Sequence, residues 1–71
     1  MTHQPRPVQV ITTNLDDDIL SSYVIDHAKP HHRNWLRRHI HWALNTHNHV
    51  ELITLSADST VTFSPKEPSD D

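Results

Sequence analysis

The 71-residue chain contains no glycine and no cysteine. Without glycine it cannot form the phosphate-binding loops, the dinucleotide fingerprint or the nucleophile elbow, because each of these needs glycine at fixed positions. Its tight turns must rely instead on Asn, Asp and Ser. Without cysteine it forms neither a disulfide nor a thiolate metal site, which fits a reducing compartment. We therefore expect a cytoplasmic protein.

Long hydrophobic runs are also missing, and no stretch approaches the roughly 18 apolar residues of a transmembrane helix. The opening residues, MTHQPRPVQV, show neither the apolar segment nor the cleavage pattern of a targeting signal. A chain of this length supports one domain with a small core. We expect a single domain over 1–71, with a flexible lead-in at 1–7, a disordered acidic tail at 65–71 and no membrane association.

Charge is segregated along the chain, although the net charge is only −3 with neutral histidines. Residues 14–26 hold four aspartates and no basic residue, whereas residues 27–50 hold four Lys and Arg residues and no acidic one. Residues 30–49 also contain both tryptophans and six of the eight histidines. Because an ordinary imidazole titrates near pH 6.5, the charge of this segment depends on pH.

The segment 30–47 has the pattern of an amphipathic helix. Pro30 suits a first helical position, and Asn48 can end the helix in the left-handed conformation. One apolar stripe, which we expect to face the core, follows helical spacing. This stripe consists of Leu36, Ile40, Ala43, Leu44 and His47.

The two tryptophans lie on a second face of the same predicted helix. Trp35 and Trp42 are seven residues apart, and their face is rotated by about a third of a turn from the apolar stripe. They either pack on another element of the same chain or form an exposed aromatic and arginine surface, a composition enriched at binding hot spots. The predicted partner-binding residues are Trp35, Arg38, His39, Trp42, His31, Arg33 and Arg37.

Three other segments have strand character. Residues 7–13 contain a β-prone run of Val, Ile and Thr, and residues 50–55 have apolar side chains on both faces, as expected of a central strand. Residues 60–64 alternate apolar and polar side chains, and should form an antiparallel hairpin with 50–55.

The segment 15–28 is ambiguous. Asn14 can cap a helix whose first turn contains Asp16, Asp17 and Asp18, and the apolar residues that follow have helical spacing. The competing interpretation is a strand at 19–26, since its Ser, Tyr, Val and Ile residues are poor helix formers.

These elements define an α+β protein. We predict a long central helix packed on an antiparallel three-stranded sheet, in the order β-α-α-β-β, and the alternative is a ββαββ arrangement with a four-stranded sheet. The predicted core is Val10, Ile11, Ile19, Leu20, Val24, Leu36, Ile40, Leu44, Val50, Leu52, Val61 and Phe63.

The histidines do not have the spacing of a helical metal site. The pairs His39/His41 and His47/His49 are each two residues apart, which on a helix directs them about 200° from each other. No pattern of nucleophile and base, or of paired carboxylates, marks a catalytic centre. We therefore predict no enzymatic activity, no cofactor and no bound metal.

A chain of this kind offers a partner mainly its surface. We predict a small protein-binding module, of the type of phage or mobile-element accessory proteins, that inhibits or regulates a larger host protein. The basic helix suits an acidic groove, and a homodimer is a further prediction. The alternative is a nucleic-acid-binding protein in which the His- and Arg-rich helix contacts phosphates.

Overall fold

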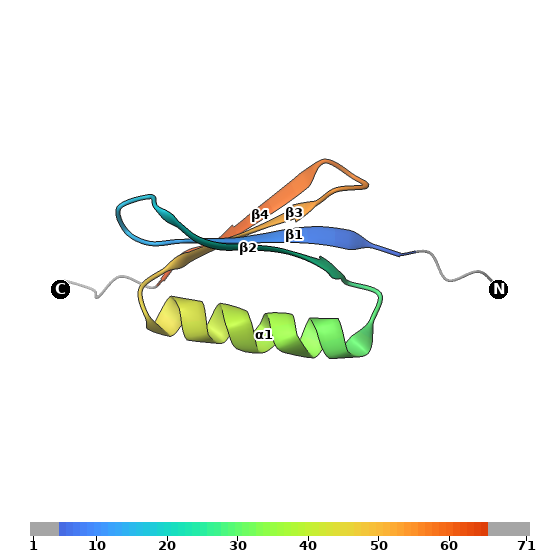
Figure 1. The fold of residues 1–71 in the computed structure, drawn as a ribbon, viewed down its shortest axis with the longest axis horizontal. Helices are drawn as coiled ribbons and strands as arrows, with labels where there is room; N and C mark the ends of the chain where they lie inside the picture. The colour runs from blue at the N-terminus through green and yellow to red at the C-terminus, as the bar shows by residue number, and fades with distance from the viewer. Residues whose placement is uncertain (1–4, 66–71) are drawn as a thin grey trace, which may run out of the picture.

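The computed structural model describes residues 5–65. Its elements are β1 (Pro7–Thr13), β2 (Ile19–Asp26), α1 (Pro30–Asn45), β3 (His49–Thr54) and β4 (Ser59–Phe63). The four strands form one antiparallel sheet in the order β2-β1-β3-β4, and α1 lies on one of its faces (Figure 1). The α+β class is confirmed, and the topology is the four-stranded ββαββ alternative.

The prediction of a helix at 15–28 was wrong, because this segment forms a tight turn followed by β2. Oδ1 of Asn14 accepts hydrogen bonds from the backbone N–H groups of Asp16 and Asp18, each at 2.9 Å. Asp17 has a φ of 64°, a left-handed conformation that Asp adopts more readily than most residues. Asn14 therefore closes a hairpin turn instead of capping a helix.

The core lies between α1 and the middle of the sheet. Because α1 contacts both β2 and β3, which flank β1, its axis runs over β1. The buried apolar residues are Val8, Val10, Ile25, Leu36, Ala43 and Val50. Four partly buried residues pack around them, namely Trp35, Ile40, Leu52 and Phe63. Most of the predicted core residues of α1, β3 and β4 are thus confirmed, as is the core-facing position of Ala43, whereas Val8 and Ile25 were not predicted as core.

Six residues predicted as core lie outside it. Leu44 of α1 is only half-buried and does not belong to the core. Ile19, Leu20, Val24 and Val61 are all at least half exposed. Ile11 is only half-buried, and strand alternation directs it to the sheet face opposite α1, because its neighbours in β1 point towards the helix. The predictions for the strand residues failed because β2 and β4 are the two edge strands and the outer face of the described sheet has no covering layer (Figure 1).

Helix α1 ends two residues before the predicted end, at Asn45. The left-handed residue that follows is His47, with a φ of 63°, and not Asn48. Asn48 is buried instead, and its backbone N–H donates to the carbonyl of Ala43 at 2.8 Å. His47 is exposed, so its assignment to the core-facing stripe was wrong. A left-handed backbone turns this side chain away from the helix face that precedes it.

The ends of the sheet differ slightly from the predicted boundaries. Pro7 belongs to β1, and the N–H of Arg6 donates to Oδ1 of Asp26 at 2.8 Å, so the predicted lead-in overlaps the folded part. The rest of that lead-in before residue 5, and the predicted tail after Pro65, lie outside the described residues. Within the described part of the chain, no helix combines the length and apolar character that crossing a membrane requires.

Candidate functional site

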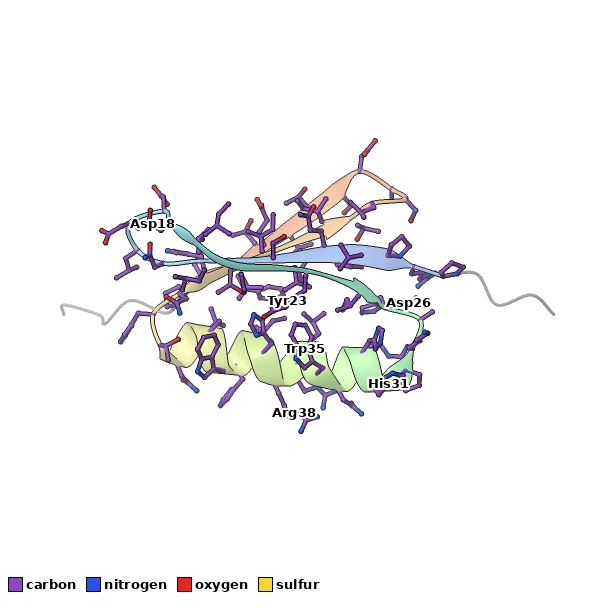
Figure 2. The ribbon with its side chains drawn as sticks, viewed as in Figure 1. Asp18, Tyr23, Asp26, His31, Trp35 and Arg38 are labelled. Carbon is purple, nitrogen blue, oxygen red and sulfur yellow. The ribbon has the colours of Figure 1, made fainter. Side chains whose placement is uncertain are left out.

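Four rings gather on the side of α1 that faces β2, and we call them the aromatic flank: Tyr23, Trp35, His39 and Trp42. Trp35 and His39 stack with ring centroids 4.8 Å apart and planes at 11°. Tyr23 meets Trp35 edge-on at 5.5 Å, and Figure 2 shows it pointing from β2 towards the helix. The centroids of His39 and Trp42 are 5.6 Å apart. Helical spacing of three and four residues places the three helix rings in one row.

The aromatic flank is only partly covered by the rest of the chain. Trp35 packs against the core and is half-buried, whereas Trp42 is 52% exposed and Tyr23 is 50% exposed. The first interpretation, packing within the same chain, therefore holds for Trp35, and the second, an exposed ring, holds for Trp42. Trp35 serves the fold, and Trp42 leaves a large apolar ring at the surface.

His39 attaches the aromatic flank to the sheet. Its Nε2 atom lies 2.7 Å from Oγ1 of Thr12, a fully buried hydroxyl of β1. Burial lowers the pKa of His39 below the ordinary value, because desolvation penalises the charged imidazolium. A neutral ring that is hydrogen-bonded on one side and stacked on Trp35 is a rigid support for the surface around it.

The structure divides the other predicted partner-binding residues between two sides of α1. At about 100° per residue, His31 and Arg38 lie on the same side of the helix as Trp35 and Trp42. Figure 2 shows Arg38 pointing away from the sheet. Five of the seven predicted residues therefore share one side of α1.

Arg33 and Arg37 project from the opposite side of the helix, away from the tryptophan row. Nη1 of Arg33 donates to the carbonyl of His27 at 2.9 Å, so this residue braces the connection between β2 and α1. Sequence reasoning did not include Tyr23 in the site. The strand interpretation of 19–26 could have found it, since that interpretation places Tyr23 on the same sheet face as Ile25.

Strand β2 lies at the edge of the sheet, and the hydrogen bond at its C-terminal end shows which of its backbone groups point towards β1. The N–H of His27 donates to the carbonyl of Arg6 at 2.8 Å, which continues the ladder between β1 and β2. Because antiparallel pairs alternate, the backbone groups of Ser22, Val24 and Asp26 point away from β1. The N–H of Asp26 agrees with this, since it donates to Nδ1 of His32 at 2.9 Å.

The outward backbone groups of Ser22 and Val24 lie in an uncharged strand. The first seven residues of β2, ILSSYVI, include no charged side chain and no proline. Three of them, Ile19, Leu20 and Val24, are between 51% and 66% exposed. The register of β2 shifts against β1 next to Ile19 and Leu20, and such a bulge locally disrupts pairing. This edge can therefore accept a further strand along its regular part.

A shallow groove of about 370 Å³ separates the edge strand from the helix. It is lined by Tyr23, Val24, Ile25, His32 and Trp35. The aromatic flank, the groove and the β2 edge thus form one continuous and mainly apolar surface.

Nothing in the described part of the chain resembles a metal centre, because no group of three or more His, Asp or Glu side chains is placed to share an ion there. Comparison of the chain with protein-family models, curated protein sequences and solved structures finds no match. Function must therefore be inferred from the surface itself.

Proposed function

We propose that this protein is a small non-enzymatic binding module that attaches to another protein through the aromatic flank and the neighbouring β2 edge. The observation that carries the proposal is the half-exposed Trp42 and Tyr23 beside an uncharged free strand edge. Exposed strand edges bind partners through backbone hydrogen bonds, and Trp, Tyr and Arg dominate interface energetics. The same surface combines both kinds of contact.

The charge of α1 sets the kind of larger protein that this module would regulate or inhibit. Arg37, Arg38 and His41 are exposed on the helix, and residues 27–50 contain no acidic side chain. An acidic groove would complement this surface and accelerate association. Small size and the absence of cysteine further suit a cytoplasmic accessory protein of the phage or mobile-element type.

Nucleic-acid binding is the second candidate, favoured by the same exposed arginines. Single-stranded nucleic acids bind proteins through phosphate contacts and through stacking of bases on aromatic rings. Trp35 is already stacked on His39 and half-buried, so Trp42 is the one tryptophan with a half-exposed ring. This limits the stacking that α1 can provide, and protein binding is the stronger proposal.

The test is to capture proteins from a lysate of the organism that carries this sequence. The bait is the chain itself, compared with Trp42→Ala and with Leu55→Ala. Leu55 is 46% exposed and follows β3, away from the aromatic flank, so it controls for the general loss of an exposed apolar side chain. We expect Trp42→Ala to weaken partner binding at least about tenfold, as for an interface hot spot, and Leu55→Ala to retain it.

Two outcomes would contradict the proposal. Equal capture by the Trp42→Ala and Leu55→Ala variants would remove the aromatic flank from the interface. Capture of nucleic acid, with an affinity that falls steeply as salt increases, would support the second candidate instead.

A further inference from the structure

We infer that the partner of the β2 edge is a second copy of this chain. Two copies would pair antiparallel along β2 about a twofold axis, and their four-stranded sheets would join into one continuous sheet with both helices on the same face. The inference rests on the proposed function, since it names the occupant of the proposed protein-binding surface.

The first argument is the edge itself. Long, uncharged and apolar edge strands are the ones that pair with further chains, and soluble proteins usually protect them with charges, proline or short length. Strand β2 has eight residues, and the only charged one, Asp26, is at its end. Its outward backbone groups at Ser22 and Val24 lie near its centre, so an identical antiparallel strand can place the same groups opposite them.

The second argument is charge complementarity between the two ends of β2. Asp16, Asp17 and Asp18 form an acidic turn before β2, whereas His27, Lys29 and His31 form a basic corner after it. Figure 2 shows Asp18 at one end of the strand and His31 at the other. Antiparallel pairing places the acidic turn of each copy beside the basic corner of its partner, so the favourable contact occurs twice.

Asp26 lies within the basic corner, where it is used by its own chain. Its Oδ1 atom accepts hydrogen bonds from the N–H groups of Arg6 at 2.8 Å and Ala28 at 3.0 Å. An unrelated strand would need an acidic segment at one end, a basic segment at the other and an uncharged centre. A second copy of this chain has all three.

The third argument is the position of the aromatic flank relative to the twofold axis. Since α1 runs over β1, the two helix axes would be separated by three strand spacings, about 14 Å. Helices in direct contact are about 8–10 Å apart, so large side chains must fill the space between them. The aromatic flanks of both copies face this space. The exposed rings of Tyr23 and Trp42 would then be covered.

A dimer of this kind leaves the outer sides of both helices accessible. Arg37 and His41 of each copy would lie on one face of the joined sheet, which gives a larger basic surface than one copy has. A larger acidic partner would then bind across the two helices, and Trp42→Ala would weaken its capture by dissociating the dimer.

The test is sedimentation equilibrium of the purified chain with variants at the two sheet edges. Ser22→Pro removes an outward N–H without removing a bond to β1, and Thr62→Pro is its matched control on β4. The N–H of Leu55 donates to the carbonyl of Pro7, so alternation across β3 directs the backbone of Thr62 away from the sheet. Ser22→Ala is a second control, because it keeps the N–H and loses only the bond from Gln9 Nε2 to Ser22 Oγ.

We expect the unmodified chain, Thr62→Pro and Ser22→Ala to be dimers, and Ser22→Pro to raise the dimer dissociation constant at least about tenfold. If Ser22→Pro fails to fold by circular dichroism, a charge exchange replaces it. Asp16→Lys should then weaken the dimer, and adding Lys29→Glu should restore it.

A monomeric unmodified chain would overturn the inference and leave the proposed function to be decided by the capture experiment. A dimer that Thr62→Pro dissociates and Ser22→Pro leaves intact would also overturn it, as would a charge exchange without restoration. Conversely, a dimer confirmed here with no loss of capture in Trp42→Ala would contradict only the proposed binding of a larger protein through the aromatic flank.

Discussion

The two edges of the sheet present different surfaces. Strand β2 has eight residues and β4 has five. Strand β2 exposes Ile19, Leu20 and Val24 in addition to Tyr23 of the aromatic flank, whereas β4 exposes one large apolar residue, Val61, among serine and threonine. The hairpin of β3 and β4 also turns its tip away from α1, so no helix flank accompanies the β4 edge there (Figure 1).

The two edge strands therefore differ in length and in exposed apolar side chains, although neither has a charged residue at its centre. Short length and small polar side chains protect β4, because a pairing there would form few hydrogen bonds and bury little apolar surface. At β2 the hydrogen-bonding edge coincides with half-exposed rings. Four substitutions or conditions test this contrast, ordered from the largest expected effect.

Leu36→Ala should have the largest effect, because Leu36 is buried where α1 meets the sheet. We expect a loss of about 2–5 kcal/mol in the free energy of unfolding, measured by urea denaturation. The exposed control Leu55→Ala should change it by less than about 0.5 kcal/mol. Similar losses in both variants would mean that α1 is not held to the sheet by this core, and the aromatic flank would lose its fixed position.

Thr12→Val should cost about 1–3 kcal/mol, because it leaves His39 without its hydrogen-bond partner in the sheet. The substitution keeps the shape of the side chain, so the loss reports on the hydrogen bond. Thr13→Val is the control, since strand alternation directs Thr13 to the opposite sheet face. Equal unfolding free energies for the two variants would contradict the role assigned to His39 in attaching the aromatic flank.

Val24→Lys tests the contrast between the edges directly. Val24 is 64% exposed, so lysine should leave the fold intact while adding charge to the β2 edge. We expect the dimer dissociation constant to rise at least tenfold, about 1.4 kcal/mol, in sedimentation equilibrium. Thr60→Lys, on the corresponding side of β4, should leave it unchanged. Equal changes of the dimer dissociation constant in Val24→Lys and Thr60→Lys would contradict the assignment of the dimer contact to the β2 edge.

Acidification should produce the smallest effect through His39. The pKa of His39 is lowered in the folded chain from the ordinary value of 6.5, so the unfolded chain binds a proton first as pH falls. The contribution of the neutral ring to the free energy of unfolding is present above pH 6.5 and decreases as pH falls towards the folded-state pKa. His39→Gln should show a shallower decrease in urea denaturation, and identical slopes would contradict this assignment.

Local patterns in the sequence predicted much of the fold. The start of α1 at Pro30 follows from a residue that needs no N–H bond there, and the central position of β3 follows from apolar side chains on both of its faces. The segment 15–28 could not be decided in the same way, because Asn14 can satisfy N–H groups in a helix cap or in a hairpin turn. Pairing with β1 favours the strand, and that pairing is not local in sequence.

The candidate site, like the fold, could be predicted only as far as local spacing along the chain specifies it. The row of Trp35, His39 and Trp42 follows from helical spacing alone, as does the proximity of Arg38. Tyr23 joins this row only because β2 packs beside α1, and the exposure of Val24 depends on its place at the sheet edge and on the uncovered outer face of the sheet. Neither fact has a signal within a few residues along the chain.

Spacing and composition are enough to specify the long basic helix, its row of rings and the segregation of acidic and basic residues along the chain. The tertiary structure decided which strand lies at the edge, which side chains remain exposed and which charges lie at the two ends of β2. Burial and strand order depend on contacts between segments far apart in the chain, and no local preference specifies them.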